Sequence, residues 1–265
     1  MSLVNTASAD PWLRPYTGVD APRVRLVCLP YAGGTAPAFR SWPTWLPPDV
    51  EVIAVQYPGR QDRFAEPCAG EMADLVTPIA QRLRHLTDAP LVVFGHSMGA
   101  SVAYEVTVEL ERLNGSSAVN LLVVSGNSPP HRTDSDDTHQ LSDAELIEEV
   151  RRHNSSFTEA LESPELVELL LPMIRADYRV SETYLRTNPA PVSAPVLACG
   201  GDADPDVDAA DLADWSVVAS GAFDTMTFPG GHFYLADDEG SVVSALAPQR
   251  PGGRVSPQPA EQRVV

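Results

Sequence analysis

The chain has 265 residues, of which 43% are hydrophobic, and this suits one α/β domain with an insertion and a sizeable core. Its formal net charge of −18 argues against nucleic acid and anionic membrane surfaces as partners. No apolar stretch approaches the roughly 18 residues of a membrane helix, and residues 1–22 lack a basic segment followed by an apolar run. We therefore expect a soluble, cytoplasmic protein that binds neither nucleic acid nor membrane.

The three cysteines, Cys28, Cys68 and Cys199, are far apart and match neither a C-x-x-C pair nor a metal-binding pattern with histidine. They are most simply reduced thiols. Cys28 and Cys199 fall in strand-like apolar runs, where a small core residue fits. We expect no metal and no organic cofactor.

Three regions differ in composition. Residues 1–22 are polar and contain prolines, which predicts a loosely held lead-in. Residues 23–247 hold the predicted helices and strands and should form the domain. Residues 248–265 are rich in Pro, Gly, Gln and Arg, a composition that predicts a disordered tail.

Apolar runs alternate with helix-like segments along most of the chain. The predicted strands are residues 23–31, 51–57, 91–94, 119–124, 195–199 and 225–228. The predicted helices between them are residues 70–86, a segment from residue 100 onward, and residues 208–216. This alternation favours a mostly parallel central sheet flanked by helices, with its functional residues at the C-terminal ends of the strands.

The alternation stops between about residues 129 and 191, where no strand is predicted. Helices are expected at 142–152 and 164–186, and Ser142 with Glu145 fits a capping box that begins the first of them. An all-helical insertion between strands of a parallel sheet predicts a lid over the site. A helical decoration remote from the chemistry is the alternative.

The apolar run at 91–94 leads directly into residues 95–99, G-H-S-M-G, and then into a helical segment. A G-x-S-x-G sequence between a strand and a helix is the nucleophile-elbow pattern, in which the serine backbone is strained and the glycines prevent collisions. Free N–H groups and the positive end of the helix dipole then face the serine hydroxyl. We predict that Ser97 is a nucleophile.

Residues 31–36, Y-A-G-G-T-A, form a loop of small residues after the first long strand. In α/β hydrolases such a loop brings backbone N–H groups close to the ligand and makes half of an oxyanion hole. An ordinary glycine turn is the alternative. We predict that the N–H groups of Ala32 and Met98 bind the oxyanion.

A serine nucleophile needs a base, and the base needs an orienting partner. Among the six histidines, only His232 follows a late strand at the C-terminal edge of the sheet, in a glycine-flanked loop. His96 lies inside the elbow, where its side chain should point away from Ser97. We predict that His232 is the base.

The acid is expected after one of the two strands that precede His232. The loop after residues 195–199 offers three carboxylates, and Asp204 occupies the usual position after the glycines. The chain order nucleophile, acid, histidine is then the one expected of this fold. Asp202 is the alternative acid, and Asp206 should be solvated.

Several stretches together resemble the type II thioesterases associated with polyketide synthases and nonribosomal peptide synthetases. They are residues 29–34 (LPYAGG), 57–63 (YPGRQDR), 95–100 (GHSMGA), 171–178 (LPMIRADY), 201–205 (GDADP) and 229–233 (PGGHF). The resemblance implies an α/β-hydrolase fold with a helical lid. It also implies a catalytic triad of Ser97, Asp204 and His232, with Ala32 and Met98 as the oxyanion donors.

The activity implied by the resemblance is hydrolysis of acyl groups from the phosphopantetheine thioester of an acyl carrier protein or peptidyl carrier protein. This editing activity frees blocked polyketide or nonribosomal peptide assembly lines. Because carrier proteins are usually acidic, we expect several arginines to form a basic rim for docking. They are Arg60, Arg63, Arg151, Arg152, Arg175 and Arg179. The competing interpretations are a small-molecule carboxylesterase or lipase of the same fold and a non-catalytic hydrolase-fold binding protein.

Overall fold

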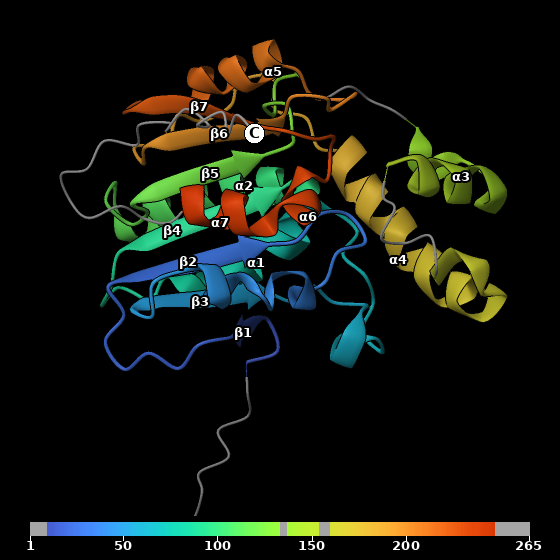
Figure 1. The fold of residues 1–265 in the computed structure, drawn as a ribbon, viewed down its shortest axis with the longest axis horizontal. Helices are drawn as coiled ribbons and strands as arrows, with labels where there is room; N and C mark the ends of the chain where they lie inside the picture. Colours follow the sequence, from blue (N-terminus) through green and yellow to red (C-terminus); the bar gives the residue numbers. More distant parts are fainter. Residues whose placement is uncertain (1–9, 133–136, 154–159, 247–265) are drawn as a thin grey trace, which may run out of the picture.

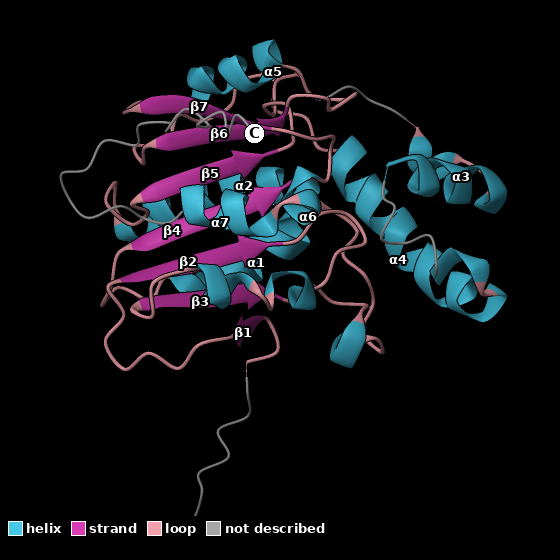
Figure 2. Ribbon diagram, in the orientation of Figure 1, coloured by secondary structure: helices cyan, strands magenta, loops and turns pink. Residues whose placement is uncertain are grey.

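A computed structural model describes residues 10–132, 137–153 and 160–246 of the chain (Figure 1). Within these residues, seven strands form one sheet in the order β1-β3-β2-β4-β5-β6-β7, and only the pairing of β1 with β3 is antiparallel. Figure 2 shows the strands side by side, with helices on both faces of the sheet. The predicted mostly parallel sheet flanked by helices is confirmed.

The strands are β1 (Leu13–Pro15), β2 (Val24–Leu29), β3 (Val50–Val55), β4 (Leu91–His96), β5 (Leu121–Ser125), β6 (Val196–Gly201) and β7 (Phe223–Phe228). The helices are α1 (Met72–Leu83), α2 (Met98–Asn114), α3 (Asp143–His153), α4 (Pro164–Glu182), α5 (Ala209–Asp214), α6 (Tyr234–Asp237) and α7 (Glu239–Leu246). Every residue of β2, β4 and β6 is buried, because helices cover the sheet from both sides.

Successive strand residues face two different apolar cores. On β2, Val27 packs in a cluster with residues of α1, α2 and α5, whereas Cys28 packs in a second cluster with residues of α7. In the view of Figure 1, α7 lies in front of the sheet and α1 and α2 lie behind it. This two-residue period fixes the register of each parallel pair. Because these strands are parallel, their C-terminal ends lie together at one edge of the sheet.

The helices α3 and α4 form the insertion between β5 and β6, and Figure 1 shows them beside the C-terminal ends of the strands. The insertion has an apolar cluster of its own, made by Leu146, Val150, Leu161, Leu171, Met173 and Ile174. The capping box at the start of α3 is present, since Ser142 N donates to Glu145 Oε2 at 3.0 Å and Glu145 N donates to Ser142 Oγ at 3.4 Å. The predicted helical lid insertion is confirmed.

The C-terminal part of the lid is fixed to α2. Beyond the end of α4, Tyr184 Oη donates to Glu105 Oε1 at 2.6 Å and Arg186 Nε donates to the same oxygen at 2.7 Å. Glu105 lies on α2 and is buried. The lid therefore returns to the sheet along the helix that begins at the elbow.

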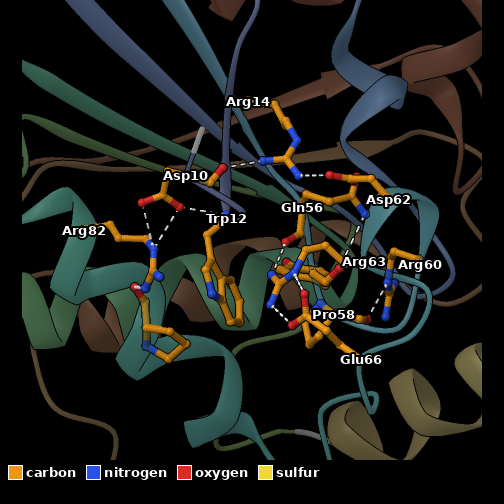
Figure 3. Close-up of polar contacts among 12 residues, drawn as sticks. Asp10, Trp12, Arg14, Gln56, Pro58, Arg60, Asp62, Arg63, Glu66 and Arg82 are labelled. Carbon is orange, nitrogen blue, oxygen red and sulfur yellow. Dashed lines mark hydrogen bonds and ion pairs between the residues drawn. The ribbon is translucent and has the colours of Figure 1, made fainter. Parts of the chain in front are cut away.

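The expected lead-in is wrong for the part of it that forms β1. Leu13 pairs with Val55, Trp12 is 7% exposed, and Gln56 N donates to Trp12 O at 2.8 Å. Figure 3 shows the Trp12 ring between two arginines: the guanidinium of Arg63 lies 4.2 Å from the ring centroid and that of Arg82 lies 5.6 Å from it. These cation–π contacts and the sheet pairing hold the segment in place.

Trp12→Ala is expected to lower the free energy of unfolding by about 3–5 kcal/mol, the usual cost of removing a large buried aromatic side chain. Urea unfolding followed by circular dichroism measures the change. The matched control is Trp45→Ala, because Trp45 is 48% exposed and its removal should cost well under half as much. Equal losses for the two variants would contradict a fixed role for residues 12–15.

None of the described helices is both long and apolar enough to span a membrane. The predicted disordered tail, residues 248–265, lies outside the described residues.

Candidate active site

The turn between β4 and α2 holds Ser97 in a backbone conformation that few non-glycine residues adopt. Its φ is 54° and its ψ is −126°, while β4 ends at His96 and α2 begins at Met98. Ser97 N donates to Ser125 O on the neighbouring strand at 2.8 Å, so the sheet itself keeps the strained turn in place. The hydroxyl group thus stands at the C-terminal edge of the sheet, at the start of a 17-residue helix.

Two glycines allow the elbow to pack tightly. A Cβ atom at Gly95 would lie 1.9 Å from Gly99 O, and one at Gly99 would lie 2.3 Å from Leu29 O and 2.6 Å from Pro30 O. The first turn of α2 is therefore in close contact with the end of β2 and with the loop that follows it. Only glycine permits this approach.

The loop at residues 30–34 turns through Gly33, whose φ is 76°, and closes with a hydrogen bond from Gly34 N to Tyr31 O of 2.8 Å. Ala32 is half-buried within this loop, and Met98 is buried in the first turn of α2. The first N–H groups of a helix have no partner inside it. The contact of Gly99 with Pro30 thus brings the loop of Ala32 against the helix start that carries the Met98 N–H.

Asp204 and His232 follow β6 and β7, and the structure brings them together. His232 Nδ1 lies 2.9 Å from Asp204 Oδ2; the Asp204 side chain has no exposed surface and that of His232 is 13% exposed. Burial acts to raise the pKa of Asp204, but the hydrogen bond and charge of His232, together with N–H groups from residues 206 and 207, outweigh it and lower the pKa. The carboxylate therefore stays ionised at neutral pH beside the imidazole.

The other two aspartates of this loop are both exposed to solvent. Asp202 is exposed and accepts a hydrogen bond from Gly230 N at 3.0 Å. Asp206 is exposed, as expected of a solvated residue, and its N–H donates to Asp204 Oδ1 at 3.0 Å. Asp204, Asp206 and His232 are the one set of three metal-type ligands that the described residues bring together. Within this set, His232 Nδ1 is hydrogen-bonded to Asp204 Oδ2.

His96 connects the elbow to His232. Its ring centroid lies 5.1 Å from that of His232, and its Nδ1 lies 2.9 Å from Ser125 Oγ, which in turn lies 2.6 Å from Tyr234 Oη. Burial, followed by the charge of His232, lowers the pKa of His96 well below its usual value, so this ring stays neutral. Because His96 directly precedes Ser97, the ring contact places His232 beside the elbow. The sequence reasoning missed Ser125 and Tyr234 as the partners of His96.

The expected basic rim is wrong for the two arginines nearest the strand ends. Arg60 is 2% exposed and bonds to Asp177, and Arg63 is 5% exposed and bonds to Glu66. Three of the remaining arginines are also ion-paired, Arg151 with Glu148, Arg152 with Glu149 and Arg175 with Asp143. A buried guanidinium needs a carboxylate partner. Because Arg60 and Arg63 are buried and paired in this way, neither adds a positive charge to a docking surface.

The strained serine between a strand and a helix, together with an Asp–His pair after the last two strands, defines an α/β hydrolase. A family model described as a thioesterase domain matches residues 24–249. The chain belongs to the thioesterase family.

Known relatives narrow this family further. Thioesterase PikA5 from Streptomyces venezuelae is 40% identical over 237 residues, which cover 89% of this chain and 84% of that protein. The type II thioesterase BorB, from the borrelidin biosynthetic cluster, has a similar structure with a TM-score of 0.82 and 36% identity, over 89% of this chain and 96% of that chain. YbtT, a type II thioesterase from the yersiniabactin NRPS/PKS pathway, gives a TM-score of 0.80 and 28% identity over the same shares. The resemblance to type II thioesterases of polyketide and nonribosomal peptide pathways is confirmed.

Proposed function

We propose that the protein hydrolyses acyl groups from the phosphopantetheine thioester of an acyl or peptidyl carrier protein, and so edits an assembly line. The observation that carries this proposal is the Asp204–His232 pair beside the strained turn at Ser97, in a chain similar to type II thioesterases. A cytoplasmic location stays a prediction from the sequence.

In the proposed mechanism, Ser97 Oγ attacks the acyl carbonyl carbon while His232 takes the hydroxyl proton. The tetrahedral intermediate collapses, the C–S bond breaks, and His232 returns the proton to the departing pantetheine thiolate. Water then attacks the acyl-enzyme with the same histidine as base, which releases the free acid and restores the Ser97 hydroxyl. Asp204 holds the imidazole tautomer and stabilises the imidazolium form.

The oxyanion donors in this proposal are the backbone N–H groups of Ala32 and Met98. The close packing of Gly99 against Pro30 supports it, because that contact sets the loop and the helix start side by side. In the part of the chain that the structure describes, the N–H of Ala32 meets no protein acceptor. Two fixed donors aimed at a developing negative charge are the largest single source of rate enhancement in acyl transfer.

The substrate class is tested with one acyl group presented in two forms, as a carrier-protein thioester and as a simple oxygen ester. Intact-mass spectrometry of the carrier protein follows loss of the acyl group, and Ser97→Ala serves as the blank. We expect kcat/KM to be at least about tenfold higher for the carrier thioester, because the carrier and its arm supply binding energy remote from the reacting bond.

Acyl-pantetheine without the carrier protein is the matched control, and it should fall between the two substrates. A higher kcat/KM for the oxygen ester would contradict the proposal and indicate an esterase. An absence of turnover with all three forms would indicate a binding protein.

A further inference from the structure

A buried aspartate of the lid reaches the loop that carries Ala32. Asp177 lies on α4 and is 1% exposed, and its Oδ2 accepts a hydrogen bond of 2.7 Å from Gly33 N, 144 residues earlier in the chain. Gly33 directly follows Ala32. A single lid side chain thus contacts the peptide next to the proposed oxyanion donor.

Arg60, in the loop that follows β3, completes the connection. Its Nη1 and Nη2 donate to Asp177 Oδ2 and Oδ1, each at 2.7 Å, in a bidentate pair. The same Nη1 donates to Gly34 O at 3.1 Å, and Nε donates to Pro58 O at 3.3 Å, a contact drawn in Figure 3. Two N–H groups of Arg60, on Nη1 and Nε, are therefore directed at backbone carbonyls.

The loop is also held on the other side of Ala32. The guanidinium of Arg60 lies 5.3 Å from the centroid of the Tyr57 ring, and Tyr57 Oη donates to Pro30 O at 3.2 Å. Backbone groups before and after Ala32 are thus fixed by side chains from the loop that follows β3 and from the lid. A buried ion pair needs further hydrogen bonds for its remaining protons and lone pairs, and this pair makes them with the backbone of Gly33 and Gly34, next to Ala32.

We propose that Asp177 and Arg60 are positioning residues for catalysis: they fix the direction of the Ala32 N–H, so that the seating of lid helix α4 sets the geometry of the oxyanion hole. The inference rests on the proposed function, which assigns the oxyanion to Ala32 and Met98. Neither side chain needs to touch the substrate. Their effect passes through Gly33 and Gly34 to the adjoining peptide.

The test uses Asp177→Asn, since an amide oxygen can accept from only part of the original set and carries no charge to pair with Arg60. Steady-state kinetics with a small acyl thioester should show kcat lowered about 10- to 100-fold with KM nearly unchanged. This is less than the roughly 10²- to 10³-fold loss caused by deleting an oxyanion donor. A trifluoromethyl ketone forms an oxyanion when the serine attacks it. Its inhibition constant should rise by a similar factor, because the variant binds this oxyanion less tightly.

The matched control is Asp143→Asn, which removes the 2.6 Å ion pair between Arg175 of α4 and the start of α3 but leaves the loop untouched. Its kcat and its ketone inhibition constant should equal those of the wild type. An equal loss of kcat in both variants would attribute the effect to the lid as a whole and overturn the inference. So would a loss of kcat by Asp177→Asn without weaker ketone binding.

Arg60→Lys provides a second variant in case Asp177→Asn does not fold. A lysine keeps the buried charge paired but cannot hold both carboxylate oxygens and Gly34 O together. Full kcat in this variant overturns the inference. Hydrolysis by Ser97→Ala at a rate close to that of the wild type would instead contradict the proposed function. A large loss of kcat in Ser97→Ala together with full kcat in Asp177→Asn would contradict the positioning role alone.

Discussion

Ser97→Ala is expected to lower kcat for hydrolysis of an acyl-carrier thioester by at least about 10⁴-fold, because the reaction loses the nucleophile that splits it into two easier steps. A small residual rate should persist, since the oxyanion donors and the binding contacts remain. Mass spectrometry of the carrier protein over time measures the loss. A fluorophosphonate should add one adduct to the wild type and none to the variant.

The matched control is Ser101→Ala, the same substitution one turn further along α2. Ser101 is buried and accepts a hydrogen bond from Asn127 Nδ2 at 2.8 Å. Its kcat should stay within a few-fold of the wild type. Turnover by Ser97→Ala at a comparable rate would rule out the serine as nucleophile.

Asp204→Asn should reduce kcat by about 10³- to 10⁴-fold with little change in KM. The amide can donate to His232 Nδ1, which would leave the imidazole in the tautomer that cannot take the serine proton. Steady-state kinetics with the carrier thioester give both constants. Asp202→Asn and Asp206→Asn are the controls, because both carboxylates are exposed, and a larger loss in Asp202→Asn would reassign the acid.

The inner strands β2, β4 and β6 were predictable from sequence because they are buried on both faces and appear as largely apolar runs. The runs at 91–94 and 195–199 correspond to β4 and β6, each of which ends two residues later than predicted. Their C-terminal additions include glycines, which carry no apolar signal and are required for close packing at the site. The lid helices were predictable for a different reason, since α4 has an apolar face with helical period and α3 has a capping box.

The strand β1 could not be predicted from local pattern. It is three residues long and ends in a proline. Its Leu13 pairs with Val55, and Trp12, directly before it, contacts Arg63 and Arg82; all three partners lie far away in the chain. Helix α7 was also missed. Its burial depends on contact with the second apolar core rather than on a strong pattern of its own.

The error about Arg60 has a physical lesson. A loop with two arginines favours an exposed basic surface when it is considered alone. The contrary signal lay in α4, where Asp177 follows Met173 and Ile174 at helical spacing and so falls on the apolar face. A carboxylate on a buried face requires a cationic partner. That requirement predicts a buried arginine but does not say which one.

The antiparallel strand β1 also has a consequence for how copies of the chain meet in solution. Without it, β3 would be the edge of the sheet, and its sequence, Val-Glu-Val-Ile-Ala-Val, has high β-propensity. An uncovered edge of this kind recruits strands from other molecules and promotes aggregation. The covering strand is short, carries Arg14, and ends in Pro15, which has no N–H to offer a neighbour. The first described residues thus protect the sheet against intermolecular β-pairing.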